Sequence, residues 1–241
     1  MIILFNVTAI TAISLFSGCG GDSLGIENAG VKLVGYAEYI PTFQKSHDLN
    51  FENCKLIGDG NVMNITEKDL TEFKNVDIIF GGFPCQSFSS AGKRKLDDPR
   101  NNLFKDFVRI TDIVKPKLII GENVKGLLTK RDKNGNLIID IIKKEFENIG
   151  YSVKYSLLKC IDYGIPQLRE RVFIICCRTD LNYSLDFPEP IGIKTDLNFI
   201  IQESLFGAIE VVNFPIEPTL RVNNINLKIS GSPSKYLSSM I

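Results

Sequence analysis

Residues 76–95 read VDIIFGGFPCQSFSSAGKRK, and the organisation of the chain can be worked out from this stretch. The apolar run at 76–80 is typical of a buried strand, and Gly81-Gly82 ends it. The side chains that follow, including Cys85, are expected at the carboxyl edge of a sheet, where open α/β folds bind ligands. Cys85 is therefore a candidate nucleophile, and the basic run at 93–95 is a candidate for holding phosphate. The alternative is that Cys85 is a small apolar residue that packs at the strand end.

The composition is that of a globular domain without electrostatic bias. The 241 residues are 44% hydrophobic and 23% charged with a net charge of zero, which suits a chain that buries a sizeable core. A nucleic-acid partner must therefore be argued from local clusters of charge. The six cysteines form no C-x-x-C pair, which argues against a zinc site or a disulfide scaffold. The single histidine, His47, is expected on the surface of a helix.

The first 16 residues are apolar, but they carry no basic flank and no small-residue cleavage site. The stretch is also short for a membrane span. We expect a leading extension followed by a strand, in a reduced, cytoplasmic protein without a membrane segment.

Three successive strands are predicted to end in residues that suit a nucleotide-like ligand. The first runs into a glycine-rich turn at 17–21, where the backbone can approach a ligand at the start of a helix. Glu38 ends the second, 20 residues after Gly18, a spacing typical of a carboxylate that accepts ribose hydroxyls. Tyr39 is placed to stack on a base, and Asp59, after the third strand, to contact adenine. A tight turn and solvated strand-end carboxylates are the alternatives, since the full G-x-G-x-x-G pattern is absent.

Helical spacing of apolar residues recurs between the strands. It is seen at 103–114, after an Asp98-Pro99 pair typical of a helix start, and at 137–149, before a glycine. Strands that alternate with helices predict an α/β fold. Beyond Asp180, prolines separate short apolar pieces, so we place a domain boundary near residue 180.

Two more groups of polar residues are expected at the same edge of the sheet. Glu122 follows a buried strand and either faces the same site as Cys85 or is a helix cap or surface acid. Gln167, Arg169 and Arg171 alternate before another buried strand, so an extended backbone places them on one face. Such a face suits an anion or a base edge, and the alternative is an exposed edge with solvated arginines.

Four segments occur in one order over about residues 10–180: LFSGCGG, GFPCQSFSSAGK, ENVKG and YGIPQLRERVFII. Together they closely resemble the DNA (cytosine-5)-methyltransferases of bacterial restriction–modification systems. The resemblance implies an α/β, Rossmann-like S-adenosylmethionine-dependent methyltransferase fold, with a mostly parallel sheet and helices on both faces. It also implies an S-adenosylmethionine-binding catalytic domain at 1–180 and the start of an incomplete target-recognition region at 181–241.

The resemblance implies S-adenosyl-L-methionine as the cofactor and double-stranded DNA as the partner. Cys85 would be the nucleophile that adds to C6 of cytosine, and Glu122 would be a neutral acid or close hydrogen-bond partner at N3. Arg169 would contact the cytosine O2, and Arg171 would order the site and favour the thiolate. The cofactor would be held by Phe16, Ser17, Gly18, Gly20, Glu38, Tyr39, Asp59, Pro84 and Leu103. DNA with its target base flipped out would contact Gln86, Ser89, Lys93, Arg94 and Gln167.

The C-terminal part of the family pattern has no match. In the family, a target-recognition domain and two further motifs follow the arginine-containing strand, and neither motif is recognisable before Ile241. We therefore expect either a complementing subunit that carries these motifs or a truncated gene. The other hypotheses are methylation of transfer RNA, an inactive remnant that only binds cofactor, DNA or another methyltransferase, and an NAD-dependent dehydrogenase. The last explains neither Pro-Cys-Gln nor Glu-Asn-Val.

Overall fold

The computed structural model describes residues 9–84, 103–132, 134–165 and 167–191, all within one unit of the chain, Met1–Phe206. These residues form one seven-stranded sheet in the order β3-β2-β1-β4-β5-β7-β6. The strands are β1 (Thr11–Leu15), β2 (Lys32–Ala37), β3 (Lys55–Leu56), β4 (Ile78–Gly81), β5 (Leu118–Val124), β6 (Tyr151–Lys159) and β7 (Glu170–Arg178). The α-helices are α1 (Gly21–Asn28), α2 (Pro41–Asn50), α3 (Leu103–Val114) and α4 (Ile138–Asn148). Short 3-10 helices include η1 (Thr71–Phe73), η4 (Lys125–Leu128), η5 (Cys160–Tyr163) and η6 (Thr179–Leu181).

Most of the sheet is parallel. β1 pairs in parallel with β2 and β4, β2 with β3, and β4 with β5. β7 is antiparallel to both of its neighbours, β5 and β6. Antiparallel neighbours need no crossover helix, which explains why two strand patterns follow each other directly after residue 150. The prediction of a mostly parallel α/β sheet is confirmed.

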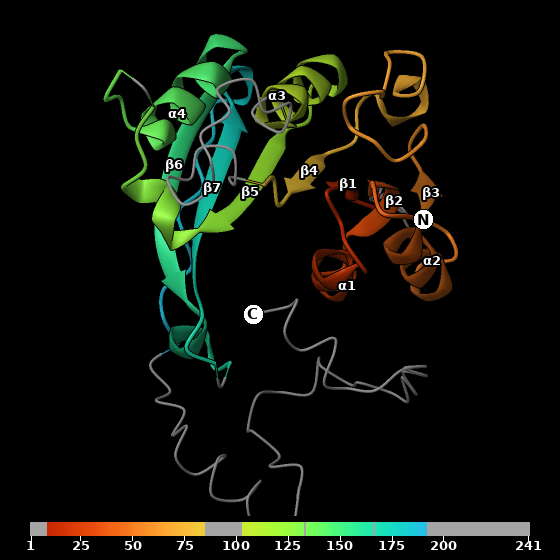
Figure 1. Ribbon diagram of the computed structural model, residues 1–241, viewed down its shortest axis with the longest axis horizontal. Helices are drawn as coiled ribbons and strands as arrows, with labels where there is room; N and C mark the ends of the chain where they lie inside the picture. The colour runs from red at the N-terminus through yellow and green to blue at the C-terminus, as the bar shows by residue number, and fades with distance from the viewer. Residues whose placement is uncertain (1–8, 85–102, 133, 166, 192–241) are drawn as a thin grey trace, which may run out of the picture. The chain divides into compact units, whose positions relative to one another are not determined.

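Helices cover both faces of the sheet, with α3 and α4 on one side and α1 and α2 on the other (Figure 1). The larger core packs against α3 and α4, whose buried side chains recur at helical spacing. These side chains include Phe104, Phe107, Ile110, Val114, Ile138, Ile139, Ile142 and Phe146. The Phe83 ring lies 5.5 Å from that of Phe104 and 5.6 Å from that of Phe107, measured between centroids. This core therefore anchors the chain immediately before Pro84.

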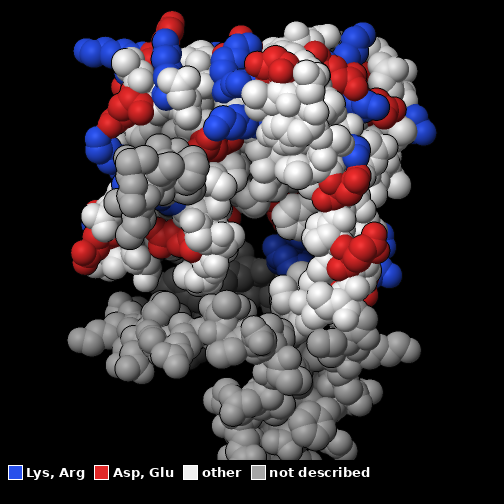
Figure 2. All heavy atoms as spheres, turned by 180° about the vertical axis from the view of Figure 1, so that it is seen from behind, with Lys and Arg blue, Asp and Glu red and all other residues white. Residues whose placement is uncertain are grey.

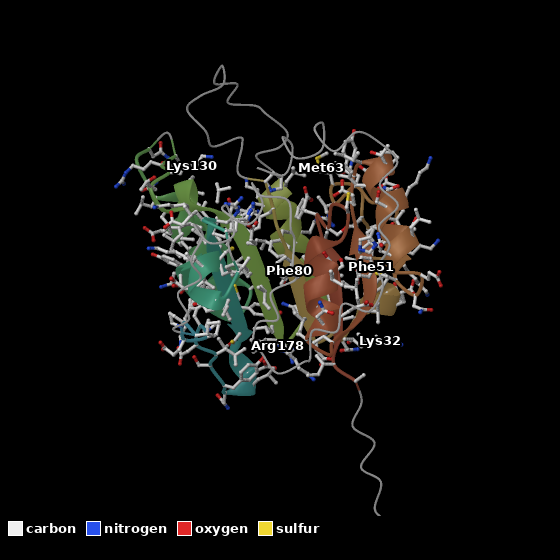
Figure 3. All side chains as sticks on the ribbon, turned by 90° about the horizontal axis from the view of Figure 1, so that it is seen from below. Lys32, Phe51, Met63, Phe80, Lys130 and Arg178 are labelled. Atoms are coloured by element: carbon white, nitrogen blue, oxygen red, sulfur yellow. The ribbon has the colours of Figure 1, made fainter. Side chains whose placement is uncertain are left out.

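The carboxyl ends of the parallel strands meet at one edge of the sheet. In Figure 3, Met63, which follows β3, and Lys130, which follows β5, lie toward this edge. Lys32 at the start of β2 and Arg178 at the end of β7 lie at the opposite edge. Because β7 is antiparallel, its first residue, Glu170, also reaches the carboxyl edge. The topology thus brings the residues after β1 to β5 together with those around the start of β7.

His47 is buried, and the expectation that it lies on the surface is wrong. Its side of α2 packs on β2, where its ring stacks on Tyr36 with centroids 3.7 Å apart. Its Nε2 lies 2.9 Å from Ser23 Oγ of α1. Burial lowers the pKa of His47 to about 4, because the imidazolium would lose its hydration. The neutral ring therefore belongs to the packing between the two helices and β2.

No helix among the described residues is long and apolar enough to cross a membrane.

The helix start expected at Asp98-Pro99 lies outside the described residues, and α3 begins within them at Leu103. The domain boundary expected near residue 180 remains a prediction.

Candidate active site

The turn after β1 is tight and has a left-handed backbone at three residues. Phe16, Gly18 and Gly20 all have positive φ angles, of 62°, 57° and 94°. The chain reverses through a hydrogen bond from the Gly20 N–H to the Ser17 carbonyl of 2.9 Å. A Cβ at position 20 would lie 2.3 Å from Phe51 Cε2, so only glycine fits there. The predicted glycine turn is confirmed as a strand-to-helix turn that leads directly into α1.

Glu38 reaches from the end of β2 to this turn. Its Oε2 accepts the Gly18 N–H at 2.9 Å, and its Oε1 accepts the Ile40 N–H at 2.7 Å. The residue is only 8% exposed, so the interpretation of Glu38 as a solvated strand-end carboxylate is wrong. Two carboxylate oxygens offer about four acceptor positions, and these two bonds occupy half of them. Glu38 can therefore accept further hydrogen bonds from the hydroxyls of a ligand.

The loop after β3 is tied to the end of β2. Gln44 Nε2 donates to the Glu38 carbonyl at 2.6 Å and to the Asp59 carbonyl at 3.4 Å. The Asp59 carboxylate accepts hydrogen bonds from Asn64 Nδ2 at 2.7 Å and from the Asn61 N–H at 2.9 Å. These two bonds lower the pKa of Asp59 and keep it ionised. The backbone at Asp59 is thus tied to that at Glu38, and the Asp59 carboxylate is a negatively charged acceptor in this loop.

The remaining predicted cofactor residues are hydroxyl-bearing or apolar. The Ser17 Oγ is buried and has no hydrogen-bond partner among the described residues, so it can bond a ligand. Tyr39 is 71% exposed beside Glu38, and an exposed aromatic ring can cover a base. Phe16 and Leu103 are partly buried hydrophobics that pack against the larger core. S-adenosylmethionine has polar groups at its ends and an adenine ring. The glycine turn and the carboxylates of Glu38 and Asp59 suit its polar groups, and the apolar residues suit its ring.

Glu122 and two arginines form a second cluster, between β5 and β7. Arg171 Nε lies 2.9 Å from Glu122 Oε1, and Arg169 Nη2 lies 3.9 Å from the same oxygen. All three side chains are partly exposed, at 25%, 23% and 35% for Glu122, Arg171 and Arg169. Glu122 lies within a strand, so its interpretation as a helix cap is wrong, and the arginines are not free in solvent. The cluster is a partly hydrated, charged surface that can meet a polar base edge.

The cluster borders the strand that leads to Cys85. A Cβ built at Gly82, just after β4, would lie 3.5 Å from Glu122 Oε2. Pro84, which is partly buried, is the last described residue before the gap. Cys85, Gln86, Ser89, Lys93 and Arg94 lie outside the described residues, and their roles remain predictions.

Asn123 is a site residue that the sequence reasoning did not assign. It follows Glu122 on β5, and strand alternation turns its side chain to the buried face. Its Nδ2 donates to the Phe83 carbonyl at 2.8 Å, and its Oδ1 accepts the Val124 N–H at 2.9 Å. The signal available in the sequence was an amide next to Glu122 at the end of an apolar run, and its burial and its bond to Phe83 became visible only in the structure. Asn123 fixes the backbone two residues before Cys85.

Gln167 is not part of the Glu122 cluster, whose ion pairs are those with Arg169, just before β7, and Arg171, on β7. It is exposed and lies before β7, where its N–H donates to the Ile165 carbonyl at 2.7 Å. Nearby, Lys125 Nζ pairs with Glu170 Oε2 at 2.7 Å. Figure 2 shows basic and acidic side chains interspersed over the described part of the face in view, as expected for a net charge of zero. The described residues also hold no cluster of three or more His, Cys, Asp or Glu suited to a metal ion.

Known proteins are similar to this chain in sequence and in fold. The sequence profile of the family described as C-5 cytosine-specific DNA methylase matches residues 10–226. The Type II methyltransferase M.FnuDI of Fusobacterium nucleatum is 45% identical over 184 residues, 76% of this chain and 51% of that protein. The Type II methyltransferase M.HhaI of Haemophilus parahaemolyticus is 35% identical over 214 residues, 88% of this chain and 62% of that protein.

Solved structures of other proteins have a similar fold. A protein named as a DNA modification methyltransferase and encoded within an E. coli prophage gives a TM-score of 0.63 at 28% identity, covering 74% of this chain and 49% of its own. Spodoptera frugiperda DNMT2 gives a TM-score of 0.62 at 23% identity, covering 77% of this chain and 57% of its own, a likeness of fold alone.

The sheet order and the site at its carboxyl edge define a Rossmann-like methyltransferase fold. The chain belongs to the C-5 cytosine-specific DNA methylase family, whose profile spans nearly all of the described residues. It spans 51% and 62% of the length of the two relatives above.

Proposed function

We propose that this chain provides the S-adenosylmethionine site and the catalytic residues of a DNA cytosine-5 methyltransferase of the restriction–modification type, acting in the cytoplasm. The observation that carries the proposal is the Glu122 cluster, which lies at the carboxyl end of β5 beside the exit of β4. Family membership supports the reaction class. The glycine turn with Glu38 supports the cofactor class, since it presents acceptors to a hydroxyl-bearing ligand.

The reaction needs a nucleophile because C5 of cytosine is itself a poor one. In the proposed mechanism the Cys85 thiolate forms a bond to C6, and the displaced π electrons move onto C5 and the N3–O2 side of the ring. Glu122, as a neutral acid, donates its proton in a hydrogen bond to N3 and so stabilises this negative charge, and Arg169 donates to O2. Arg171, held on Glu122 at 2.9 Å, fixes the carboxyl group in place. Each residue thus acts on a different atom of one base.

S-adenosylmethionine, when bound, supplies the electrophilic methyl group that C5 of the adduct accepts. The residues that would hold it are those of the glycine turn together with Glu38, Tyr39, Asp59, Pro84 and Leu103. A base then removes the C5 proton, the electron pair reforms the C5=C6 bond, and the thiolate leaves. Because these atoms are inaccessible in a duplex, the target base must be flipped out, at a cost of about a few kcal/mol.

Covalent trapping tests the proposal. In the presence of S-adenosylmethionine, DNA that contains 5-fluorocytosine has no removable C5 proton after methyl transfer, so the adduct should persist and shift the mass of the purified chain. Cys85→Ser should abolish the adduct while S-adenosylmethionine still binds, and Cys160→Ser, at a free and partly exposed cysteine, is the matched control. A folded, cofactor-binding chain that forms no adduct under any condition would leave the inactive-remnant hypothesis in front.

Two further experiments test the complementing-subunit hypothesis and the transfer-RNA hypothesis. Because the chain spans about half the length of the Fusobacterium relative, trapping is repeated with the product of an adjacent gene. An adduct formed only in that mixture would establish the complementing subunit. Transfer RNA replaces DNA in the other arm, and preferential methylation of RNA would contradict the DNA assignment.

A further inference from the structure

A guanidinium outside the predicted site ties α3 to the loop that carries Asp59. Arg109 Nη1 donates to the Ile65 carbonyl and Nη2 to the Val62 carbonyl, both at 2.8 Å. Arg109 Nε donates to Asp106 Oδ1, one helical turn earlier, at 3.0 Å. The planar fork of arginine can bond two acceptors at once while a third group orients it. Arg109 is therefore fixed at three points.

The loop depends on such contacts because it has no regular structure of its own. Residues 57–70 connect β3 to η1 through turns, with neither helix nor strand in this fully described stretch. The Val62 and Ile65 side chains are buried in the larger core, so their carbonyls have little access to water. A buried carbonyl without a donor costs about 1–3 kcal/mol. Arg109 supplies a donor to each of these two.

The clamped carbonyls are directly connected to the ligand residues. Asn61, which precedes Val62, and Asn64, which precedes Ile65, both bond the Asp59 carboxylate. Next to Asp59, a Cβ at Gly60 would lie 2.2 Å from the Glu38 carbonyl, so the loop already touches the end of β2. A shift at residues 62–65 would therefore move the Asp59 carboxylate relative to Glu38.

We propose that Arg109 is a positioning residue for the adenine end of the S-adenosylmethionine site. This proposal rests on the function proposed above, which assigns Asp59 to adenine and Glu38 to the ribose. Helix α3 then acts twice on the same ligand. Its first residue, Leu103, lines the adenine pocket, and Arg109 sets the loop on the other side of that pocket.

The test measures the Kd of S-adenosylmethionine by titration calorimetry on the full chain. Arg109→Met should raise the Kd about tenfold or more, and Arg109→Lys should give a smaller rise, since lysine can bond one carbonyl only. Arg178→Met is the matched control. Arg178 also pairs with an aspartate, Asp180, and bonds a carbonyl, that of Lys115, but it lies at the opposite edge of the sheet (Figure 3). That variant should lower the Tm while leaving the Kd within about twofold of wild type.

Hydrogen exchange gives a readout that does not need ligand. The amides of residues 61–66 should exchange faster in both Arg109 variants and at the wild-type rate in Arg178→Met. A Kd equal to wild type in Arg109→Met, with or without faster exchange, would overturn the proposal. If Arg109→Met does not fold, Arg109→Lys and Asp106→Asn decide by the same two measurements.

The variant Glu38→Ala distinguishes a failure of the positioning role of Arg109 from a failure of the proposed cofactor site. One outcome rejects the positioning role alone. In that outcome the wild type binds S-adenosylmethionine, Glu38→Ala weakens the binding, and the Arg109 variants leave it unchanged. If the wild type does not bind S-adenosylmethionine, or Glu38→Ala binds as tightly as wild type, the proposed cofactor site fails and the positioning role fails with it.

Discussion

Neighbouring residues on β5 carry out different tasks because strand alternation sends their side chains to opposite faces. Glu122 faces Arg171 of β7 and Arg169 just before it, whereas Asn123 turns into the core and holds the Phe83 carbonyl. The carboxylate that we propose meets the substrate is thus fixed in the same two-residue unit as the amide that holds the backbone two residues before Cys85. A shift of one residue in the register of β5 would exchange the two side chains and destroy both functions.

At the residue scale, His47 should make stability depend on pH. Burial lowers its pKa in the folded protein to about 4, from an ordinary 6.5. As the pH falls below 6.5 the unfolded chain takes up a proton that the folded chain does not. Stability is therefore fully present above pH 6.5, and it is lost progressively until the folded state protonates near pH 4. The loss is about 3 kcal/mol.

Urea unfolding of wild type and His47→Gln between pH 8 and 4 measures this effect. His47 is the only histidine, so the variant should lose the pH dependence of this window while being less stable overall. Asp22 contributes with the opposite sign, because burial raises its pKa above 3.8 and acid then favours the folded state. Parallel curves for the two proteins would show that His47 is not the source.

At the element scale, the glycine turn between β1 and α1 is defined by sterics. Gly20→Ala should destabilise the chain by about 2–5 kcal/mol, because two costs add. The new Cβ disfavours the positive φ, and it also overlaps a neighbouring side chain that leaves no room for it. That side chain is Phe51, whose Cε2 would lie 2.3 Å from the added Cβ. Gly30→Ala is the matched control, with a φ of 76° and no atom within 4 Å of its Cβ. It should cost about 1–2 kcal/mol, the backbone term alone.

Urea unfolding gives the free energy for both variants, and calorimetry gives their affinity for S-adenosylmethionine. The affinity should fall in Gly20→Ala and stay near wild type in Gly30→Ala, which lies at the far end of α1. Equal losses of stability in the two variants would mean that Phe51 moves aside and that the turn tolerates a side chain.

Elements whose signals are local were predictable from the sequence. Glycine turns, apolar strands and the helical periods of α3 and α4 all lie within short windows, and the structure confirms them. The insertion of β7 between β5 and β6 is non-local, so the chain order did not indicate it. The same limit hid His47, Asn123 and Arg109, whose roles arise from contacts with residues 24, 40 and 44 or more positions away. Glu122 and the arginines became meaningful only as a set, once the sheet brought them together.

At the scale of the whole molecule, charge balance limits how DNA can be bound. The chain has 28 basic and 28 acidic side chains, so its overall field neither attracts nor repels a polyanion strongly. If this chain binds DNA as proposed, its affinity must then come from a few local phosphate contacts. The run Lys93, Arg94 and Lys95 is the densest candidate in the sequence, although it lies outside the described residues.

Replacing Lys93, Arg94 and Lys95 together by alanine should weaken DNA binding and make it less sensitive to salt. Each lost phosphate contact removes about 0.9 from the slope of log Kobs against log salt, so the triple variant should lower its magnitude by about 2–3. Lys143, Lys144 and Lys154, on α4 and β6, provide a control of equal charge change. Their replacement should leave the slope within about 0.5 of wild type, because only cations that touch phosphate release counterions. Fluorescence anisotropy with a duplex at several salt concentrations measures both slopes. Equal reductions would mean that net charge, and not the basic run at 93–95, governs binding.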